Sequence, residues 1–232
     1  TLSGNEIWSC PVPGSYPTPY YTGFYFHDQN IYLGKRNGGV QGYDKNGNPN
    51  FSTGTNDWYV QNEAGFTVPP DWEFGTPNGA IITADAPTDQ AWMTGLSTPH
   101  SSEQQSWVIS PCFDFTYSNQ PIIAFRYIGD MKNNVTGTVL QYNLGASNSW
   151  ETLGQDTLSS FGENWYNGNN IVSDPGTQGS GWTNISSGWL IARYPLDSLV
   201  GQDAVRFRIA FGTEGLNSEL KEGFAFDDVW IG

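Results

Sequence analysis

The chain has 232 residues, a length that fits one large all-β domain or one domain with a short additional segment. It carries 9 Lys and Arg against 23 Asp and Glu, and the few basic residues are scattered along the sequence. A nucleic-acid surface needs clustered positive charge to displace counterions, and an anionic membrane surface also attracts basic proteins. The composition therefore argues against both partners, and no stretch is long and apolar enough to insert into a membrane.

The balance of residue types favours strands over helices. Aromatic residues make up 15% of the chain, charged residues only 14%, and the chain contains 28 Gly and 14 Pro. Many large apolar side chains between frequent turns are typical of two packed sheets. We therefore expect an all-β fold, an antiparallel β-sandwich of the jelly-roll type.

Two cysteines, Cys10 and Cys112, leave two alternatives open. A disulfide between them would indicate an oxidising compartment and would close a loop worth about 4–5 kcal/mol in the chain-entropy model. Otherwise they are two separate buried thiols. Neither cysteine belongs to a Cys-x-x-Cys or Cys/His cluster, which argues against a structural zinc site.

Residues 1–50 differ from the rest of the sequence. They contain Pro-rich turns over 11–19, an aromatic run over 20–26 and a predicted hairpin through Asn37-Gly38. This segment is either a set of strands added to the edge of the sandwich or the tail of a preceding module. We expect residues 51–232 to form the sandwich itself, as one module of a larger protein.

Period-two alternation marks the strands of the second segment. The clearest run has Val205, Phe207, Ile209 and Phe211 on one face and Arg206 and Arg208 on the other. The remaining predicted strands cover 107–109, 121–128, 140–144, 190–196 and 224–231. Between them lie polar loops at 98–106 and 164–188, and loops on a rigid β scaffold are where such domains usually place function.

The sequence offers few tools for catalysis. His27 and His100 are the only histidines, and we expect His100 to be a solvated surface residue in its polar loop. No Gly-x-Ser-x-Gly, His-Glu-x-x-His or phosphate-binding loop is present. A carboxylate pair for glycoside hydrolysis assembles from distant segments, so it leaves no readable signal among 23 acidic residues. We therefore expect a binding protein rather than an enzyme.

The adjacent pair Asp227-Asp228 interrupts an apolar strand pattern. Alternate side chains of a strand point to opposite faces, so at least one of these carboxylates should leave the strand on the side of core residues. A buried charge needs hydrogen bonds, an opposite charge or a metal ion. The pair therefore indicates either a structural Ca²⁺ or Na⁺ site or a carboxylate satisfied by backbone N–H groups or an arginine.

An ordered set of motifs extends from about Asp57 to the C-terminus, about three-quarters of the chain. Its segments are Trp72–Pro77, Ala91–Leu96, Glu103 with Ser106–Phe115, Val139–Tyr142, Asn164–Asn167, Val205–Gly212 and Glu222–Val229. The set resembles the MAM-like, concanavalin-like jelly-roll modules of secreted bacterial proteins. These modules occur in surface adhesins, gliding-associated proteins and peptidases, many of them exported by the type 9 route.

The resemblance implies two packed antiparallel sheets and a non-catalytic role. It also implies that Asp57 and Glu103 join Asp227 and Asp228 in holding a cation, Ca²⁺ in a structural role. The chain departs from the pattern at residues 97–105, which are poorer in Asn and acidic residues than the usual loop. This departure puts a cation or ligand role for that loop in doubt.

Four loop aromatics are the candidate ligand-binding residues: Trp165, Tyr166, Trp182 and Trp189. An exposed indole can stack on the C–H face of a sugar while nearby Asn and Asp bind its hydroxyls. The alternative is that these rings cap the core of the sandwich, which is where Trp and Tyr are mostly found.

Together these observations predict a non-catalytic extracellular or cell-surface module that acts in adhesion or glycan binding. Its expected partners are a glycan or a surface protein, together with neighbouring domains of a larger chain. Two alternatives remain: an accessory domain of a secreted peptidase or polysaccharide-degrading enzyme, and a structural spacer without a ligand.

Overall fold

The computed structural model describes the backbone of three N-terminal strands and most of the chain from Trp58 onwards. The described residues are 21–27, 30–35, 40–43, 58–65, 67–87, 89–145, 147, 149–154, 162–177, 179–215 and 221–232. The hairpin expected through Asn37-Gly38 has its two strands in place, but its turn lies outside these ranges.

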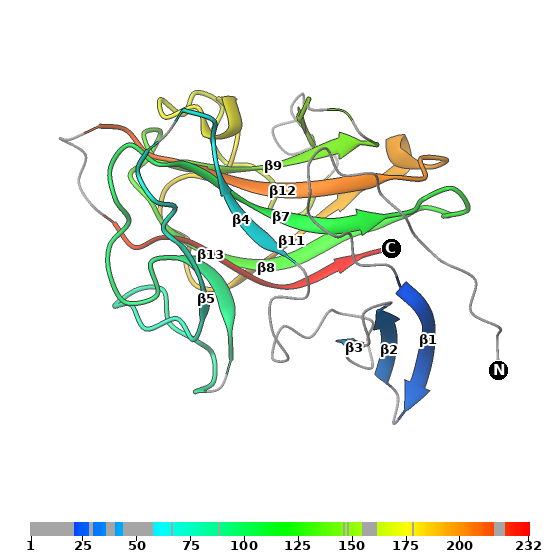
Figure 1. The fold of residues 1–232 in the computed structure, drawn as a ribbon. Coiled ribbons are helices and arrows are strands. Elements are labelled where there is room, and N and C mark those ends of the chain that lie inside the picture. Colours follow the sequence, from blue (N-terminus) through cyan, green and yellow to red (C-terminus); the bar gives the residue numbers. More distant parts are fainter. Residues whose placement is uncertain are drawn as a thin grey trace.

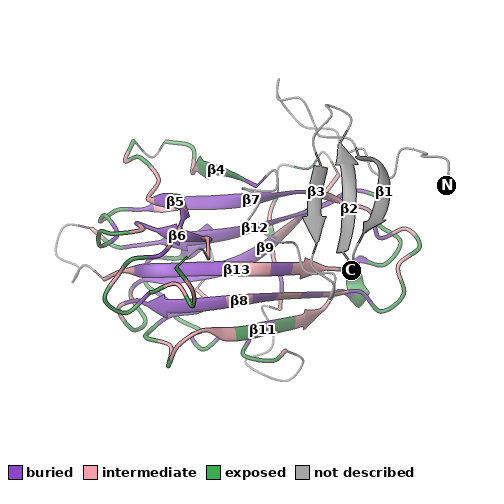
Figure 2. Ribbon diagram, turned by 90° about the horizontal axis from the view of Figure 1, so that it is seen from below, coloured by how far each residue is buried: buried purple, intermediate pink, exposed green. Residues whose placement is uncertain are grey.

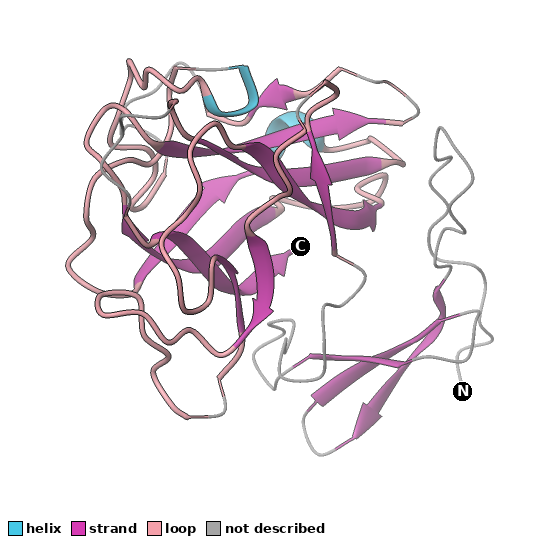
Figure 3. Cartoon of the chain, turned by 60° about the vertical axis from the view of Figure 1, so that its left-hand side comes forward, coloured by secondary structure: helices cyan, strands magenta, loops and turns pink. Residues whose placement is uncertain are grey.

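Strands dominate the fold, and the only helical segments in the described chain are short 3₁₀ turns (Figure 3). The strands are β1 (Tyr21–His27), β2 (Asn30–Lys35), β3 (Val40–Tyr43), β4 (Tyr59–Asn62), β5 (Trp72–Gly75), β6 (Ala91–Thr94), β7 (Gln105–Phe113), β8 (Ile122–Asp130), β9 (Gly137–Leu144), β10 (Glu151–Thr152), β11 (Leu190–Pro195), β12 (Val205–Gly212) and β13 (Gly223–Ile231). The 3₁₀ turns are η2 (Pro175–Thr177) and η3 (Asp197–Leu199). Among the described residues, no helix has the length and apolar character needed to cross a bilayer.

Two five-stranded antiparallel sheets pack face to face (Figure 1). Sheet B has the order β10-β9-β12-β7-β4, and sheet C has the order β11-β8-β13-β6-β5. From β7 to β9 and again from β11 to β13, consecutive strands alternate between the sheets, so neighbours in a sheet are distant in sequence. This arrangement confirms the predicted antiparallel β-sandwich. β1, β2 and β3 form a separate three-stranded sheet, and the division of the chain at residue 50 stays a prediction.

The predicted alternation sets which side chains enter the space between the sheets. Phe207, Ile209 and Phe211 of β12 are buried in the main core, as the period-two pattern predicts. The same core holds Phe125 and Tyr127 of β8 from the opposite sheet. Central strands are almost wholly buried, whereas the edge strands β4 and β11 alternate with exposed positions (Figure 2).

The free edge of β9 is covered by the loop segment 163–183. β10 pairs with β9 only at Tyr142 and Gln141, and the Leu153 N–H just after it donates to the Leu140 carbonyl (3.0 Å), which leaves the Leu140 N–H and the backbone groups of Thr138 without a partner from this side. Thr138 instead exchanges two backbone hydrogen bonds with Trp182, of 2.9 and 2.8 Å. The Tyr166 hydroxyl accepts from the Leu140 N–H (3.1 Å) and donates to its carbonyl (2.9 Å). The segment thereby satisfies polar groups that would otherwise be buried without partners.

The same segment carries aromatic rings into the core. The Trp182 side chain is 1% exposed. Its ring centroid lies 4.6 Å from that of Tyr166, 5.0 Å from Trp165 and 5.5 Å from Phe125 of sheet C. Tilted and edge-on contacts of this kind add to the energy of area burial. Trp182 therefore joins the loop to both sheets.

We expect Trp182→Ala to lower the free energy of unfolding by about 3–5 kcal/mol, because it removes a fully buried ring and leaves a cavity. Tyr117→Ala is the control, since Tyr117 is 96% exposed, and it should change stability by less than about 0.5 kcal/mol. Urea unfolding followed by fluorescence measures both. Equal effects of the two changes would contradict the role assigned to Trp182.

Candidate functional site

A groove of about 530 Å³ runs across the outer face of sheet B, a volume typical of small-ligand sites. Its described lining residues are Tyr59, Gln61, Asn62, Glu63, Ala64, Trp107, Ile109, Asn143, Ser147, Trp150, Thr177, Arg206 and Arg208. Strand register explains the arrangement, because Tyr59 of β4 pairs with Ile109 of β7, which pairs with Arg208 of β12. The three side chains therefore form a row across the sheet.

The Arg208 guanidinium lies between two indole rings. Its central carbon is 3.9 Å from the ring centroid of Trp107 and 4.5 Å from that of Trp150. Trp107 comes from β7, and Trp150 from the turn between β9 and β10. A cation over the face of an indole is attracted by the negative charge on that face, and more strongly where water is excluded. Arg208 thus holds two aromatic rings in place at the floor of the groove.

Gln141 fixes the orientation of Arg208. The buried Gln141 Oε1 accepts a 2.7 Å hydrogen bond from Arg208 Nε, while Gln141 Nε2 donates a 2.8 Å bond to the Gly176 carbonyl. Gly176 has a φ of 61°, and a Cβ there would collide with the Gln141 amide. Glycine at 176 therefore allows η2 to lie against sheet B, where Thr177 forms part of the wall of the groove.

The groove is electrostatically unusual for so acidic a chain. Arg206 and Arg208 both line it, at 8% and 6% exposure. Burial lowers the pKa of Arg208 from 12.5 to about 9, and the nearby Glu63 carboxylate partly opposes that shift. Arg208 is still cationic at neutral pH. Neither arginine forms an ion pair with any carboxylate of the described residues.

Hydrogen-bonding groups surround the aromatic floor. The Asn143 amide donates to the carbonyls of Ser147 and Ser149, the latter at 2.8 Å, and so holds the turn that carries Trp150. Gln61 of β4 lies opposite Trp107 in the strand register. Aromatic surface beside amide and guanidinium donors is suited to binding a polar ligand and orienting it.

Three of the predicted ligand-binding aromatics lie in the core instead. Trp165, Tyr166 and Trp182 are all buried, and their polar atoms are satisfied within the protein. Trp165 Nε1 donates to the Leu153 carbonyl (3.2 Å), and Trp182 Nε1 donates to the Asn164 carbonyl (3.0 Å). A sugar needs an exposed ring face to stack on. The structure therefore corrects the expectation that these rings are ligand platforms and favours the alternative that they cap the core.

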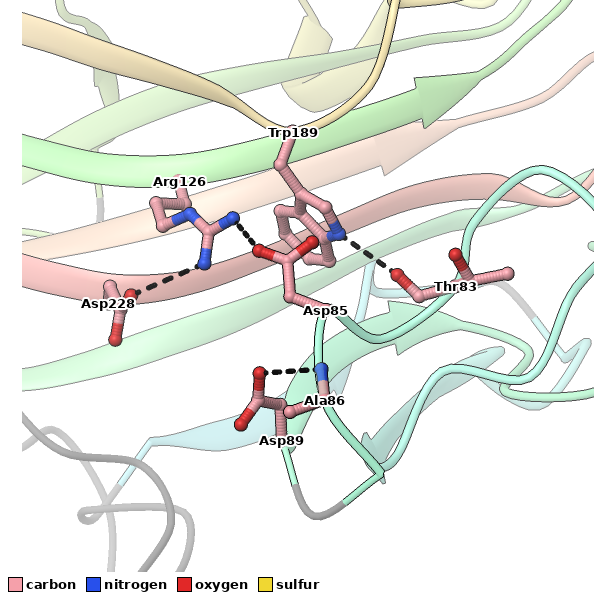
Figure 4. A network of polar contacts seen from close by, with 7 residues as sticks. All are labelled: Thr83, Asp85, Ala86, Asp89, Arg126, Trp189 and Asp228. Atoms are coloured by element: carbon pink, nitrogen blue, oxygen red, sulfur yellow. Dashed lines mark hydrogen bonds and ion pairs between the residues drawn. The ribbon is translucent and has the colours of Figure 1, made fainter.

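Trp189, the fourth predicted aromatic, belongs to a polar cluster on the outer face of sheet C (Figure 4). Its indole N–H donates to the Thr83 carbonyl (2.9 Å), and the Arg126 guanidinium lies 5.2 Å from its ring centroid. Arg126 also forms ion pairs with Asp85 and, at 3.7 Å, with Asp228. Trp189 thus ties the loop around Thr83 to sheet C, and one face of its ring is covered by Arg126.

A β-bulge changes the placement of Asp227 and Asp228. The register of β13 against β8 shifts between Asp227 and Trp230, and Asp228 has a φ of 50°. An extra residue of this kind breaks the strict alternation. Phe226 and Val229 therefore both enter the core, while the two carboxylates are only partly buried. Asp227 precedes the shift and stays on the face of Ala225, a residue of a second buried cluster with Met93 and Ile128, and its Oδ1 is buried, whereas Asp228 pairs with Arg126.

The predicted metal ligands do not converge within the described part of the chain. No group of three or more His, Cys, Asp or Glu that could hold a metal ion occurs there. Asp228 pairs with Arg126, and Glu103 lies in the turn before β7, where its N–H donates to the Glu214 carbonyl (3.0 Å). Asp57 lies outside the described residues, so cation binding by the full set stays a prediction.

The other residues singled out from sequence have mixed outcomes. Cys112 is disulfide-bonded, but Cys10 lies outside the described residues, so their pairing stays a prediction. His100 is fully buried, with its ring 5.4 Å from that of Phe211. Burial lowers the pKa of His100, which its hydrogen bond to the Ser101 carbonyl partly offsets. The expected solvated position of His100 was therefore wrong.

Sequence reasoning missed the groove on sheet B, although part of its signal was present. The alternation in β12 already placed Arg206 and Arg208 on the face opposite the core. Two arginines at adjacent outward positions are notable in a chain with only 9 Lys and Arg. The approach of Trp150 from a separate turn has no such signature in the sequence.

No protein-family model matches the chain, and no curated protein matches it. Among solved structures, the K3 cleaved adhesin domain of Lys-gingipain from Porphyromonas gingivalis is 16% identical, with a TM-score of 0.41 over 80% of this chain and 97% of that one. The K2 cleaved adhesin domain of Lys-gingipain is 14% identical, with a TM-score of 0.42 over 80% and 98%. A carbohydrate-binding module of the β-sandwich superfamily is 8% identical, with a TM-score of 0.41 over 88% and 72%. Similarity at this level says nothing about ligands. The assignment of a ligand therefore rests on the residues of this chain.

We expect Asp227→Asn to change how stability depends on pH. Burial, together with the Asp228 charge, raises the pKa of Asp227 from 3.8 to about 7. Because the folded state binds this proton more tightly, the carboxyl contributes stability below about pH 4 that is lost as pH rises to about 7. The variant lacks this titrating group, so its free energy of unfolding should not fall in the same way as pH rises. Between pH 4 and pH 8 the difference in unfolding free energy, variant minus wild type, should therefore increase by on the order of 1–3 kcal/mol, a range that is reduced because the carboxyl is partly exposed.

Urea unfolding at a series of pH values measures this difference. Asp203→Asn, the same change at an exposed carboxyl, is the control. Parallel pH curves for wild type and Asp227→Asn would show that this carboxyl does not titrate as its surroundings indicate.

Proposed function

We propose that the chain is a non-catalytic extracellular recognition module that binds a glycan in the groove on sheet B. The observation that carries this proposal is the half-buried indole of Trp150, which lies over Arg208 in a mostly polar groove that the exposed Tyr59 also lines. Sugars present an apolar C–H face and a rim of hydroxyls. Aromatic rings beside amide and guanidinium groups match both features.

The position of the aromatic residues supports this role. Trp150 is half-buried and Tyr59 is 43% exposed, so both present ring surface at the groove. An aromatic side chain that is partly exposed to water needs contacts that keep it in place. For Trp150 one such contact is the Arg208 guanidinium, which lies over its ring. Asn143 supplies a second constraint by fixing the turn that precedes Trp150.

The extracellular assignment is supported by Cys112, which is disulfide-bonded. Disulfides persist in oxidising compartments and are rare in reducing ones. Membership of the MAM-like modules and export by the type 9 route belong to the same proposal and rest on the sequence motifs. A role in adhesion would follow if the glycan lies on a surface to which the parent protein attaches.

We expect Trp150→Ala to weaken glycan binding by about tenfold or more, because it removes a central aromatic contact and frees one face of Arg208. Trp230→Ala is the matched control, since Trp230 lies on the outer face of sheet C. A glycan array followed by calorimetry on the best ligand measures the effect, with thermal unfolding to verify that both variants fold. Retained binding by Trp150→Ala, together with loss in Trp230→Ala, would move the site to the other sheet.

A further inference from the structure

Arg206 and Arg208 differ from the other arginines that the structure describes. Arg126 forms ion pairs with Asp85 and Asp228, and Arg193 pairs with Glu163. The two arginines of β12 form no ion pair with a described carboxylate, although the chain has 23 acidic residues. They are also the two more deeply buried ones, at 8% and 6% exposure. The arginines with least access to water are therefore the ones without an anionic partner among these residues.

Such an arrangement has a physical cost that a ligand can relieve. Removing a charge from water is unfavourable unless hydrogen bonds or an opposite charge compensate. Of the guanidinium N–H groups of Arg208, Nε is satisfied by Gln141, and the indoles cover the faces of the group. No side-chain hydrogen bond from Arg206 to a described residue is present. The remaining N–H groups lie in the plane of each guanidinium, where a planar or tetrahedral oxyanion accepts two bonds at once.

The spacing of the two arginines fits one ligand. Residues two apart on a strand lie on the same face, about 7 Å from each other along the chain. Both line the same groove as Trp107 and Trp150. A ligand that lies along β12 can therefore meet both guanidinium groups while its rings contact Trp150 and Tyr59.

We infer that the groove binds an acidic glycan, one whose sugars carry carboxylate or sulfate groups, with Arg206 and Arg208 as the anion-binding pair. This inference rests on the proposed glycan-binding function. The net charge of −14 opposes binding that is driven by charge alone, so the ligand presents apolar sugar faces as well as anionic groups. The ring surfaces of Trp150 and Tyr59 favour a sugar over an acidic peptide, whose carboxylates sit on flexible side chains without a ring to stack.

Glu63 sharpens the inference, because it lines the same groove and acts on Arg208 electrostatically without an ion pair between them. A carboxylate at this position stabilises the arginine charge in the absence of a ligand. It also repels an incoming anion. Neutralising Glu63 should therefore strengthen the binding of an acidic glycan, an effect that a purely structural role of the groove would not produce.

The test compares four probes with the intact chain: polygalacturonate for carboxylate, a sulfated galactan for sulfate, neutral galactan, and polyglutamate as an acidic peptide. We expect at least one acidic glycan to bind about tenfold or more tightly than neutral galactan, with affinity that falls as salt rises. Which acidic glycan binds identifies the anionic group. Polyglutamate that binds as well as both acidic glycans, or better, would overturn the inference.

Three variants connect the preference to the residues. Arg206→Gln should weaken binding of the acidic glycan by about tenfold and weaken binding of neutral galactan much less, because Gln can still hydrogen-bond a hydroxyl but carries no charge. Glu63→Gln should strengthen binding of the acidic glycan. Arg193→Gln is the matched control on sheet C and should leave both affinities unchanged. If Arg206→Gln fails to fold, as thermal unfolding would show, the increase in Glu63→Gln still decides the question.

The outcomes separate this inference from the proposed function. The acidic preference would be overturned if neutral and acidic glycans bound equally well and Glu63→Gln changed neither affinity. The glycan-binding function would still stand if Trp150→Ala abolished that binding. Binding of none of the three glycans would overturn both.

Discussion

The exposed edge of β9 is the constraint on which the rest of the structure depends. A central sheet strand needs partners on both sides, because buried backbone N–H and carbonyl groups without hydrogen bonds are costly. β10 is only two residues long and meets little of that edge. Segment 163–183 supplies the missing partners through Trp182 and the Tyr166 hydroxyl. An apparently irregular loop thereby takes the place of a strand and closes one side of the sandwich.

The groove on the opposite face of sheet B follows from the same constraint. Once the segment is held at the β9 edge, it carries Gly176 to the outer face, where the carbonyl of Gly176 accepts from Gln141. Gln141 in turn orients Arg208, which holds the two indoles. Core packing and groove geometry are therefore connected through one buried amide. A change that loosened the segment would be felt at Arg208 as well as in the core.

The sequence predicted the sandwich well and its site poorly, for physical reasons. Apolar and polar residues alternate along β8 and β12, and this alternation shows which side chains face the core, because successive side chains of a strand point to opposite faces and both strands are paired on either side. The bulge at Asp228 broke that rule, since one extra residue reverses the faces after it. The loop aromatics were misplaced because composition indicates a polar loop but cannot show that the β9 edge needs covering. The groove combines Trp107, Arg208 and Trp150 from separate elements, a juxtaposition that no local pattern contains.

The contrast between Trp182 and Trp150 shows how position, rather than residue type, decides the role of an aromatic side chain. Both follow polar, turn-rich sequence and both lie near β9. Trp182 forms backbone bonds with Thr138, so its side chain is directed between the sheets, among Phe125 and Tyr127. Trp150 precedes β10 on the other side of the sheet, where it packs against the edge of the core and one face of its ring lies against the Arg208 guanidinium. Only Nε of that guanidinium donates to a side-chain acceptor among the described residues, so its other N–H groups are donors that an anionic ligand would satisfy.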